Sequence, residues 1–219
     1  MNMQHSGFMG RPVAAHAGDR FSDRMRRISA ARLDEGAHAT LNCRINAGKA
    51  PWFALRVWTG REQAVENSLG QMGVISLVPM RKGPDLRRRG RVIEGSMIPV
   101  MHGYVLVQML PVGEYLSGLL GVEHVIELLG GCDRQRPLSD REVSRFNALA
   151  MNGVYDWERP VDLVLQQGES VLITDGPYVD HRATVISPNR NRKGDVVVSV
   201  TFMGRDVPAS VPLALLKKL

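Results

Sequence analysis

Residues 103–109 read Gly-Tyr-Val-Leu-Val-Gln-Met, an almost continuous apolar run in the middle of the chain. Valine and tyrosine favour the extended backbone of a strand. A strand exposed on one face would alternate apolar and polar residues, and this run does not. The stretch therefore predicts a strand that is buried on both faces, at the centre of a sheet.

The sequence on either side of this strand predicts a mixture of strands and helices. Trp52–Trp58 alternates like a strand, and Thr59–Glu62 has the spacing of a capping box that begins a helix. Val74–Met80 predicts a second strand. Val112–Leu120 predicts a helix, Glu123–Leu129 a strand, and Ser139–Glu142 a second capping box and helix. This order predicts an α+β domain over residues 51–151, a ferredoxin-like antiparallel sheet with helices packed on it.

The pattern changes after residue 151. Residues 152–165 contain Pro160 and several acidic side chains, and we interpret them as a linker. Residues 166–219 predict a small SH3-like β-barrel. Its expected strands are Glu169–Thr174, Arg182–Ser187, Asp195–Phe202 and Arg205–Val211.

Residues 1–50 have no sustained hydrophobic period and contain eight basic and four acidic side chains. We expect a flexible basic N-terminal extension with a short helix near Ser22–Leu33.

Composition limits the classes of protein to consider. The chain has 219 residues, of which 44% are hydrophobic and 23% charged, so it can form a packed core. No apolar run reaches the length of a membrane span, and the start lacks the apolar run of a signal peptide. Cys43 and Cys132, the only cysteines, lie too far apart in sequence for a zinc knuckle and are too few for a disulfide framework. We expect a cytoplasmic protein.

Positive charge is concentrated between residues 81 and 91, where Asp85 is the only acidic side chain. Gly83–Pro84 and Gly90 are turn signals, so the stretch predicts a hairpin that leaves the sheet. It is either a solvated basic turn or a loop that contacts phosphates. Its basic residues are Arg81, Lys82, Arg87, Arg88, Arg89 and Arg91.

Motifs that carry catalysis are not found. The sequence has no glycine-rich phosphate loop, no paired cysteines and no nucleophile elbow. Glu62 and Glu66 form an acidic pair that we interpret as a solvated helix face, and His102 has no metal-ligating neighbour. We predict a protein that is not an enzyme, with no cofactor and no metal.

Two groups of motifs resemble one family. Trp52–Leu55, Thr59–Glu62 and Gly103–Met109 resemble the amino-terminal (NGN) domain of NusG-type transcription factors. Gly168–Tyr178 and Val198–Arg205 resemble a KOW domain, which follows the NGN domain in that family.

The resemblance implies a bacterial elongation factor. Such a protein binds elongating RNA polymerase at the clamp coiled coil, suppresses pausing and modulates termination or antitermination. Its KOW domain docks a second partner, such as Rho or a small-subunit ribosomal protein. The extension and the unusual Met101–His102 pair favour a specialised paralogue. Two alternatives stay open: a ribosome-associated KOW-type RNA-binding protein, and a catalytic protein with an unrecognised site.

The resemblance also assigns residues. Trp58, Met101 and Tyr104 would bind the polymerase, although Met101–His102 departs from the usual aromatic-proline pair, and Trp58 and Tyr104 could instead be core residues. The basic hairpin would lie near upstream DNA and the non-template strand. Arg87, Arg88, Arg89 and Arg91 would then contact phosphates, and Arg81 and Lys82 belong to the same candidate nucleic-acid surface.

The second partner would dock on Tyr178, Phe202 and Met203, unless Phe202 only fills the small core. In an RfaH-like branch of the family the carboxy-terminal domain can refold into a helical hairpin that masks the clamp site. Here the expected strands are dense in β-branched residues, and Pro188, Pro208 and Pro212 would interrupt helices, so we expect a permanent barrel.

Overall fold

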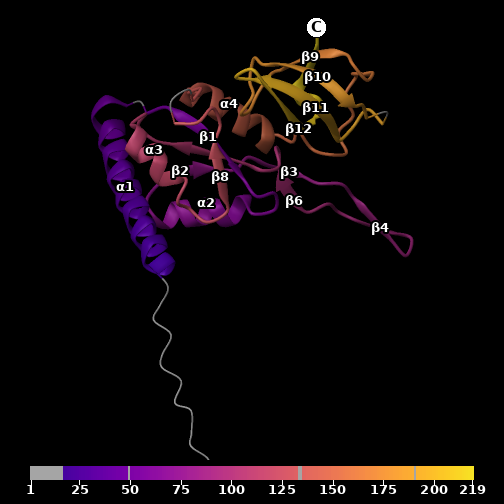
Figure 1. Cartoon of the computed structure of the whole chain (residues 1–219). Helices are drawn as coiled ribbons and strands as arrows, with labels where there is room; N and C mark the ends of the chain where they lie inside the picture. The colour runs from indigo at the N-terminus through magenta and orange to yellow at the C-terminus, as the bar shows by residue number, and fades with distance from the viewer. Residues whose placement is uncertain (1–16, 49, 133–134, 190) are drawn as a thin grey trace, which may run out of the picture.

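A computed structural model describes residues 17–48, 50–132, 135–189 and 191–219. Two compact parts pack against each other, and a long helix runs along the first of them (Figure 1). We call residues 50–151 the front domain, residues 152–165 the linker and residues 166–219 the C-terminal barrel. Within the described ranges, no helix has both the length and the apolar character needed to cross a membrane.

The front domain is built on a four-stranded antiparallel sheet in the order β2-β7-β1-β8. Every residue of β7 is buried, which confirms the prediction from the apolar run. Phe53 lies opposite Val107 and Leu55 opposite Val105, so the two central strands share one apolar face. The strands are β1 (Trp52–Val57), β2 (Ile75–Leu77), β7 (Tyr104–Gln108) and β8 (Val125–Leu128).

Helices cover both faces of this sheet, as the α+β prediction required. Helix α2 (Glu62–Gln71) and helix α3 (Gly113–Leu119) pack on the face that carries Phe53 and Leu55. Helix α4 (Asp140–Met151) packs on the opposite face. That opposite face also receives the C-terminal barrel, so it is where the two parts of the protein meet.

One of the two predicted capping boxes is confirmed. Ser139 accepts a hydrogen bond from the Glu142 amide, and the Glu142 carboxylate accepts one from the Ser139 amide. The Ser139 hydroxyl also donates to this carboxylate, and the hydrogen bonds from the Ser139 hydroxyl and amide lower the pKa of Glu142 below its usual value. The other box is wrong, because Glu62 instead accepts a buried 2.6 Å hydrogen bond from the Gly103 amide and so fixes the turn that leads into β7.

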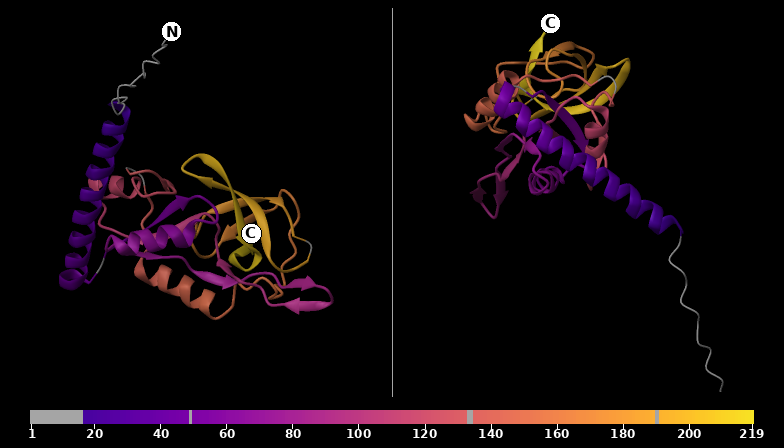
Figure 2. Two further views of the ribbon diagram at one scale, coloured as in Figure 1. Left: turned by 90° about the horizontal axis from the view of Figure 1, so that it is seen from below. Right: turned by 90° about the vertical axis from the view of Figure 1, so that its left-hand side faces the viewer.

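The basic stretch forms the predicted hairpin, as the outer part of a ribbon that projects from the body (Figures 1 and 2). The base of the ribbon pairs β3 (Met80–Lys82) with β6 (Met97–Pro99). The outer part pairs β4 (Leu86–Arg88) with β5 (Arg91–Ile93).

The C-terminal barrel is a five-stranded antiparallel sheet in the order β12-β11-β10-β9-β13, as expected for a small SH3-like domain. Strand β11 alternates buried and more exposed residues, and Val196, Val198 and Val200 fill the barrel interior. The strands are β9 (Ser170–Ile173), β10 (Arg182–Ser187), β11 (Asp195–Phe202), β12 (Arg205–Pro212) and β13 (Leu216–Lys218), with a 3-10 turn η1 (Leu213–Leu215) before β13.

The expectation of a flexible extension is wrong for residues 17–47, which form helix α1 (Ala17–Ala47). Residues 1–16 lie outside the described part. Helix α1 packs on α3 at the end of the front domain opposite to the ribbon (Figures 1 and 2). Leu33 is 1% exposed there, and the Thr40 hydroxyl accepts a 3.0 Å hydrogen bond from the Leu110 amide. The two helices approach closely because glycines lie between them. A Cβ at Gly118 would come within 2.9 Å of the Leu33 amide nitrogen.

We predict that Gly118→Ala loosens the packing of α1 on α3. The added methyl group meets backbone, so the free energy of unfolding should fall by about 1–3 kcal/mol. Gly113→Ala, at the other end of α3, is the matched control, since nothing lies within 4 Å of its added Cβ. Denaturant unfolding and tryptic cleavage within α1 measure both effects. Equal stability of the two variants would contradict this account of the packing.

Candidate functional site

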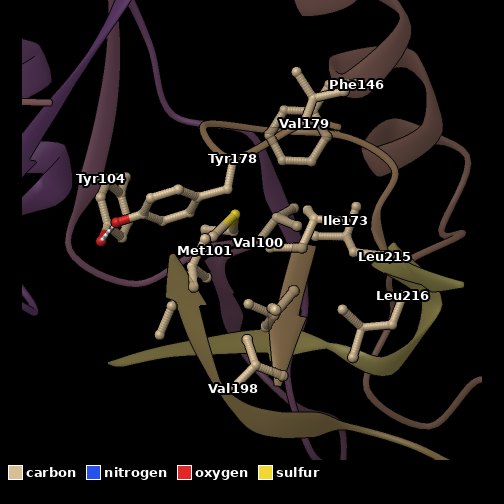
Figure 3. Close-up of a cluster of buried hydrophobic side chains, with 14 of the residues drawn as sticks. Val100, Met101, Tyr104, Phe146, Ile173, Tyr178, Val179, Val198, Leu215 and Leu216 are labelled. Atoms are coloured by element: carbon tan, nitrogen blue, oxygen red, sulfur yellow. Dashed lines mark hydrogen bonds between the residues drawn. The ribbon is translucent and has the colours of Figure 1, made fainter. Parts of the chain in front are cut away.

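Met101 and Tyr104, two of the candidate polymerase-binding residues, lie against Tyr178, one of the candidate second-partner residues (Figure 3). Met101 and Tyr104 of the front domain are 4% and 8% exposed, and Tyr178 and Phe202 of the barrel are 0% and 4% exposed. All four belong to one apolar cluster that runs without interruption from the front sheet into the barrel. In this conformation neither surface is open to another protein.

A pair of tyrosines lies at the edge of this interface. The hydroxyl groups of Tyr104 and Tyr178 are 2.6 Å apart and hydrogen-bonded, and the two rings meet edge to face with centroids 5.5 Å apart (Figure 3). Burial raises the pKa of both phenols. Tyr178 also packs edge to face on Phe202, with centroids 5.7 Å apart. The barrel therefore presents an aromatic surface that is complementary to the front domain.

The other two candidate docking residues remain at the surface. Trp58, just after β1, is 59% exposed and its ring packs on His124, with centroids 5.5 Å apart. Met203, at the turn between β11 and β12, is 53% exposed. The structure thus brings Met101, Tyr104, Tyr178 and Phe202 together and leaves Trp58 and Met203 outside the buried interface.

Arginine–aspartate pairs flank the apolar contact. The Arg145 guanidinium, on α4, donates to the Asp175 carboxylate at 2.8 Å through Nε and to the Thr174 carbonyl at 2.8 Å. Hydrogen bonding to Asp175 raises the pKa of Arg145. Arg136 forms an ion pair with Asp180 at 3.2 Å. The front domain supplies the cation and the barrel the anion in each pair.

Arg81 and Asp195 form a third such pair. The prediction that Arg81 is part of an exposed nucleic-acid surface is therefore wrong for this conformation. Its side chain has no exposed area and forms a two-pronged ion pair with Asp195 of the barrel, at 2.6 and 2.8 Å. A burial this complete leaves no room for a phosphate. The neighbouring Lys82 stays accessible and pairs with Glu94 at 3.5 Å.

The linker is ordered along its contacts with both parts. The Asp156 carboxylate accepts a hydrogen bond from the Lys82 amide at 2.9 Å, and the Trp157 amide donates to the Lys82 carbonyl at 3.0 Å. On the barrel side, the Val161 amide donates to the Arg192 carbonyl at 2.7 Å. Residues 152–165 therefore run along the junction between the front domain and the barrel and are hydrogen-bonded to both.

The outer arginines of the ribbon are exposed, in contrast to Arg81. Arg88 lies directly opposite Arg91, and Arg89 and Gly90 form the tip with positive φ angles of 48° and 76°. Like charges directly opposite each other are unfavourable. In the described part of the chain, Arg87, Arg88, Arg89 and Arg91 have no carboxylate within ion-pair distance. The tip is a compact cationic surface suited to a polyanion.

The sequence did not reveal the acidic partners of the interface. Asp175, Asp180 and Asp195 lie in turns or at a strand start, where aspartate is common for local reasons. The arginines that pair with them lie on the front domain, so these ion pairs form only when the two domains meet. Among the described residues, no group of three or more histidine, cysteine or acidic side chains is placed to hold a metal.

Comparisons with known proteins identify relatives of this chain. Residues 50–147 match the NusG family, described as "Transcription termination factor nusG". The chain is 30% identical over 185 residues to the transcription termination/antitermination protein NusG of Escherichia coli K12, covering 78% of this chain and 98% of that protein. The corresponding protein of Buchnera aphidicola is 28% identical over 181 residues, with 78% of this chain and 97% of that protein covered.

Among solved structures, one that describes domain interaction in Thermotoga maritima NusG is similar, with a TM-score of 0.41 and 23% sequence identity. It covers 80% of this chain and 99% of that one. From the match over residues 50–147 and the near-complete coverage of its curated relatives, the chain belongs to the NusG family of transcription factors.

Proposed function

We propose that this transcription factor binds elongating RNA polymerase at the clamp coiled coil through the face that carries Met101 and Tyr104. In the bacterial cytoplasm it would suppress pausing and modulate termination or antitermination as a binding factor, without catalysing a reaction. The proposal is supported by family membership and by the apolar, aromatic character of this face. Large buried side chains of this kind dominate binding at protein interfaces.

The buried Tyr104–Tyr178 contact is the observation that defines how this binding must occur. The polymerase and the C-terminal barrel would compete for the same face, so the two domains have to separate before the clamp can bind. When a binding-competent state is only partly populated, the apparent affinity falls in proportion to its population. The closed arrangement therefore lowers the affinity of the free factor for polymerase.

Opening would expose the second docking surface at the same time. Tyr178 and Phe202 would become accessible beside Met203, and this surface would dock Rho or a small-subunit ribosomal protein. Because each face covers the other, the second partner would bind better to the polymerase-bound factor than to the free factor.

The ribbon supplies a contact to nucleic acid. We propose that Arg87, Arg88, Arg89 and Arg91, assisted by Lys82, contact phosphates of upstream DNA or the non-template strand in the elongation complex. These arginines are exposed and have no acidic partner among the residues that the structure describes, which supports the proposal. Phosphate contacts of this kind position a protein without reading sequence.

Helix α1 supports the proposal that the protein is a specialised paralogue. It precedes the family match at residue 50, while the chain covers 98% of the E. coli relative. The helix adds a surface at the end of the front domain away from the ribbon (Figure 1).

Two substitutions in the tyrosine pair should change polymerase binding in opposite directions. Tyr178→Glu breaks the contact from the barrel side and leaves the front face intact, so binding to core RNA polymerase should strengthen about tenfold or more. Tyr104→Glu breaks the same contact but places a charge on the binding face, so binding should be lost. Deletion of residues 166–219 should strengthen binding as Tyr178→Glu does. Fluorescence anisotropy with labelled factor measures all three, and weaker or unchanged binding of both Tyr178→Glu and the deletion would contradict the proposal.

The ribbon makes a separate prediction about salt. Replacing Arg88 and Arg91 with glutamine should reduce the dependence of elongation-complex affinity on salt concentration, by about one phosphate contact per arginine. Arg141→Gln is the matched control, since Arg141 is an exposed arginine on α4, away from the ribbon. A titration of binding against salt measures the slope, and equal slopes for the double variant and the control would refute a phosphate contact at the ribbon.

A further inference from the structure

Arg81 is among the largest fully buried side chains of the protein, and it is charged. It lies on β3 at the base of the ribbon, opposite Ile98 of β6. A buried charge is strongly unfavourable unless it is paired and hydrogen-bonded. Groups that neutralise and hydrogen-bond this guanidinium therefore have to be in place whenever it is buried.

Those groups come from two other parts of the chain. Asp195, at the start of β11 in the barrel, accepts two hydrogen bonds from the Arg81 guanidinium at 2.6 and 2.8 Å. The linker contributes the Tyr155 carbonyl, which accepts a hydrogen bond at 3.1 Å, and the ring of Trp157, whose centre lies 5.4 Å from the Arg81 Cζ. One side chain of the front domain thus binds the linker and the barrel together.

Trp157 connects the linker to the same point of the barrel. A Cβ built on Gly194, the residue before Asp195, would come within 2.8 Å of the Trp157 ring, so the ring lies directly on the barrel backbone there. The Trp157 amide also donates to the Lys82 carbonyl, next to Arg81. The indole is therefore held between Arg81 and the start of β11.

The other cross-domain ion pairs are more exposed to solvent. In each of them at least one partner lies largely in solvent: the Arg145 side chain is 57% exposed although Asp175 is 8% exposed, and Arg136 and Asp180 are 31% and 68% exposed. The side chains of Arg81 and Asp195 are 0% and 12% exposed. Exposed pairs contribute little, whereas removing one partner of a buried pair leaves an uncompensated charge. The Arg81 pair is thus the polar contact to which closure should be most sensitive.

We propose that Arg81 is a clasp that couples the position of the barrel to the order of the linker. When Asp195 leaves, Arg81 loses its counter-charge and hydrates, and the Tyr155 carbonyl and the Trp157 ring lose their contact with it. The linker is thereby loosened at β3, where its hydrogen bonds to the Lys82 backbone remain, and it becomes more accessible to solvent. The clasp depends on the closed arrangement of the two domains. It rests on the proposed function only for the purpose of opening, which is polymerase binding.

The test uses the full chain without polymerase, so that its outcome does not depend on whether polymerase binds. Arg81→Met and Asp195→Asn remove the clasp from its two sides. Arg145→Met removes a cross-domain pair whose arginine is exposed, and Arg56→Met removes the exposed Arg56–Glu127 pair, at 3.2 Å, within the front sheet. Circular dichroism confirms that each variant keeps its helices and strands, and the Asp195 variant serves if the Arg81 variant does not fold.

The readouts are chymotryptic cleavage after Trp157 in the linker and the radius of gyration from small-angle scattering. Arg81→Met and Asp195→Asn should raise the cleavage rate at least tenfold and increase the radius of gyration. Arg145→Met should have a clearly smaller effect, and Arg56→Met should have none. Unchanged cleavage in the clasp variants would overturn the proposal, and so would an opening by Arg145→Met as large as that by Arg81→Met.

Discussion

The burial of two apolar faces against each other is the constraint on which the rest of this structure depends. Met101 and Tyr104 on one side and Tyr178 and Phe202 on the other belong to a single apolar cluster. Apolar burial provides most of the free energy of such a contact, and it has no direction. The orientation of the barrel therefore has to come from elsewhere. The hydroxyl contact of the two tyrosines and the arginine–aspartate pairs around them supply it.

This division between apolar and polar contacts suits a reversible interface. Covering the apolar face of the front domain is favourable whichever partner covers it. Another protein with an apolar surface can therefore replace the barrel. The polar contacts are specific to the closed form and are lost on opening. A factor built in this way keeps its adhesive surfaces covered until a competing surface is present, which also limits their exposure to non-specific association.

The elements of the fold could be predicted where the sequence carries a local signal. The apolar run of β7 and the capping box at Ser139 depend on neighbours in the chain, and both were predicted. Of helix α1 only a short part, near Ser22–Leu33, was predicted, because few of its residues are buried and glycines such as Gly118, on another element, make its packing possible. The Thr59–Glu62 box failed for a related reason, since Glu62 bonds to Gly103, 41 residues away.

The same difference between local signals and long-range contacts explains which parts of the candidate site could be predicted. Aromatic and apolar residues marked two adhesive surfaces, but no feature of the sequence shows that the surfaces bind each other. Arg81 seemed to belong with the other arginines of the ribbon because it is close to them in sequence. Its environment is set by Asp195, which lies 114 residues further along the chain. Residue type indicated the chemistry, and the tertiary contacts decided which groups were accessible.

The most direct test of the account is the distance between the two domains in the free factor and in the polymerase complex. Spin labels at the exposed residues Asn67 and Lys217, in a chain with both cysteines replaced by serine, would report this distance by pulsed electron resonance. The account predicts one narrow distribution for the free chain and a longer, broader one on core RNA polymerase. The same narrow distribution in both states would contradict it.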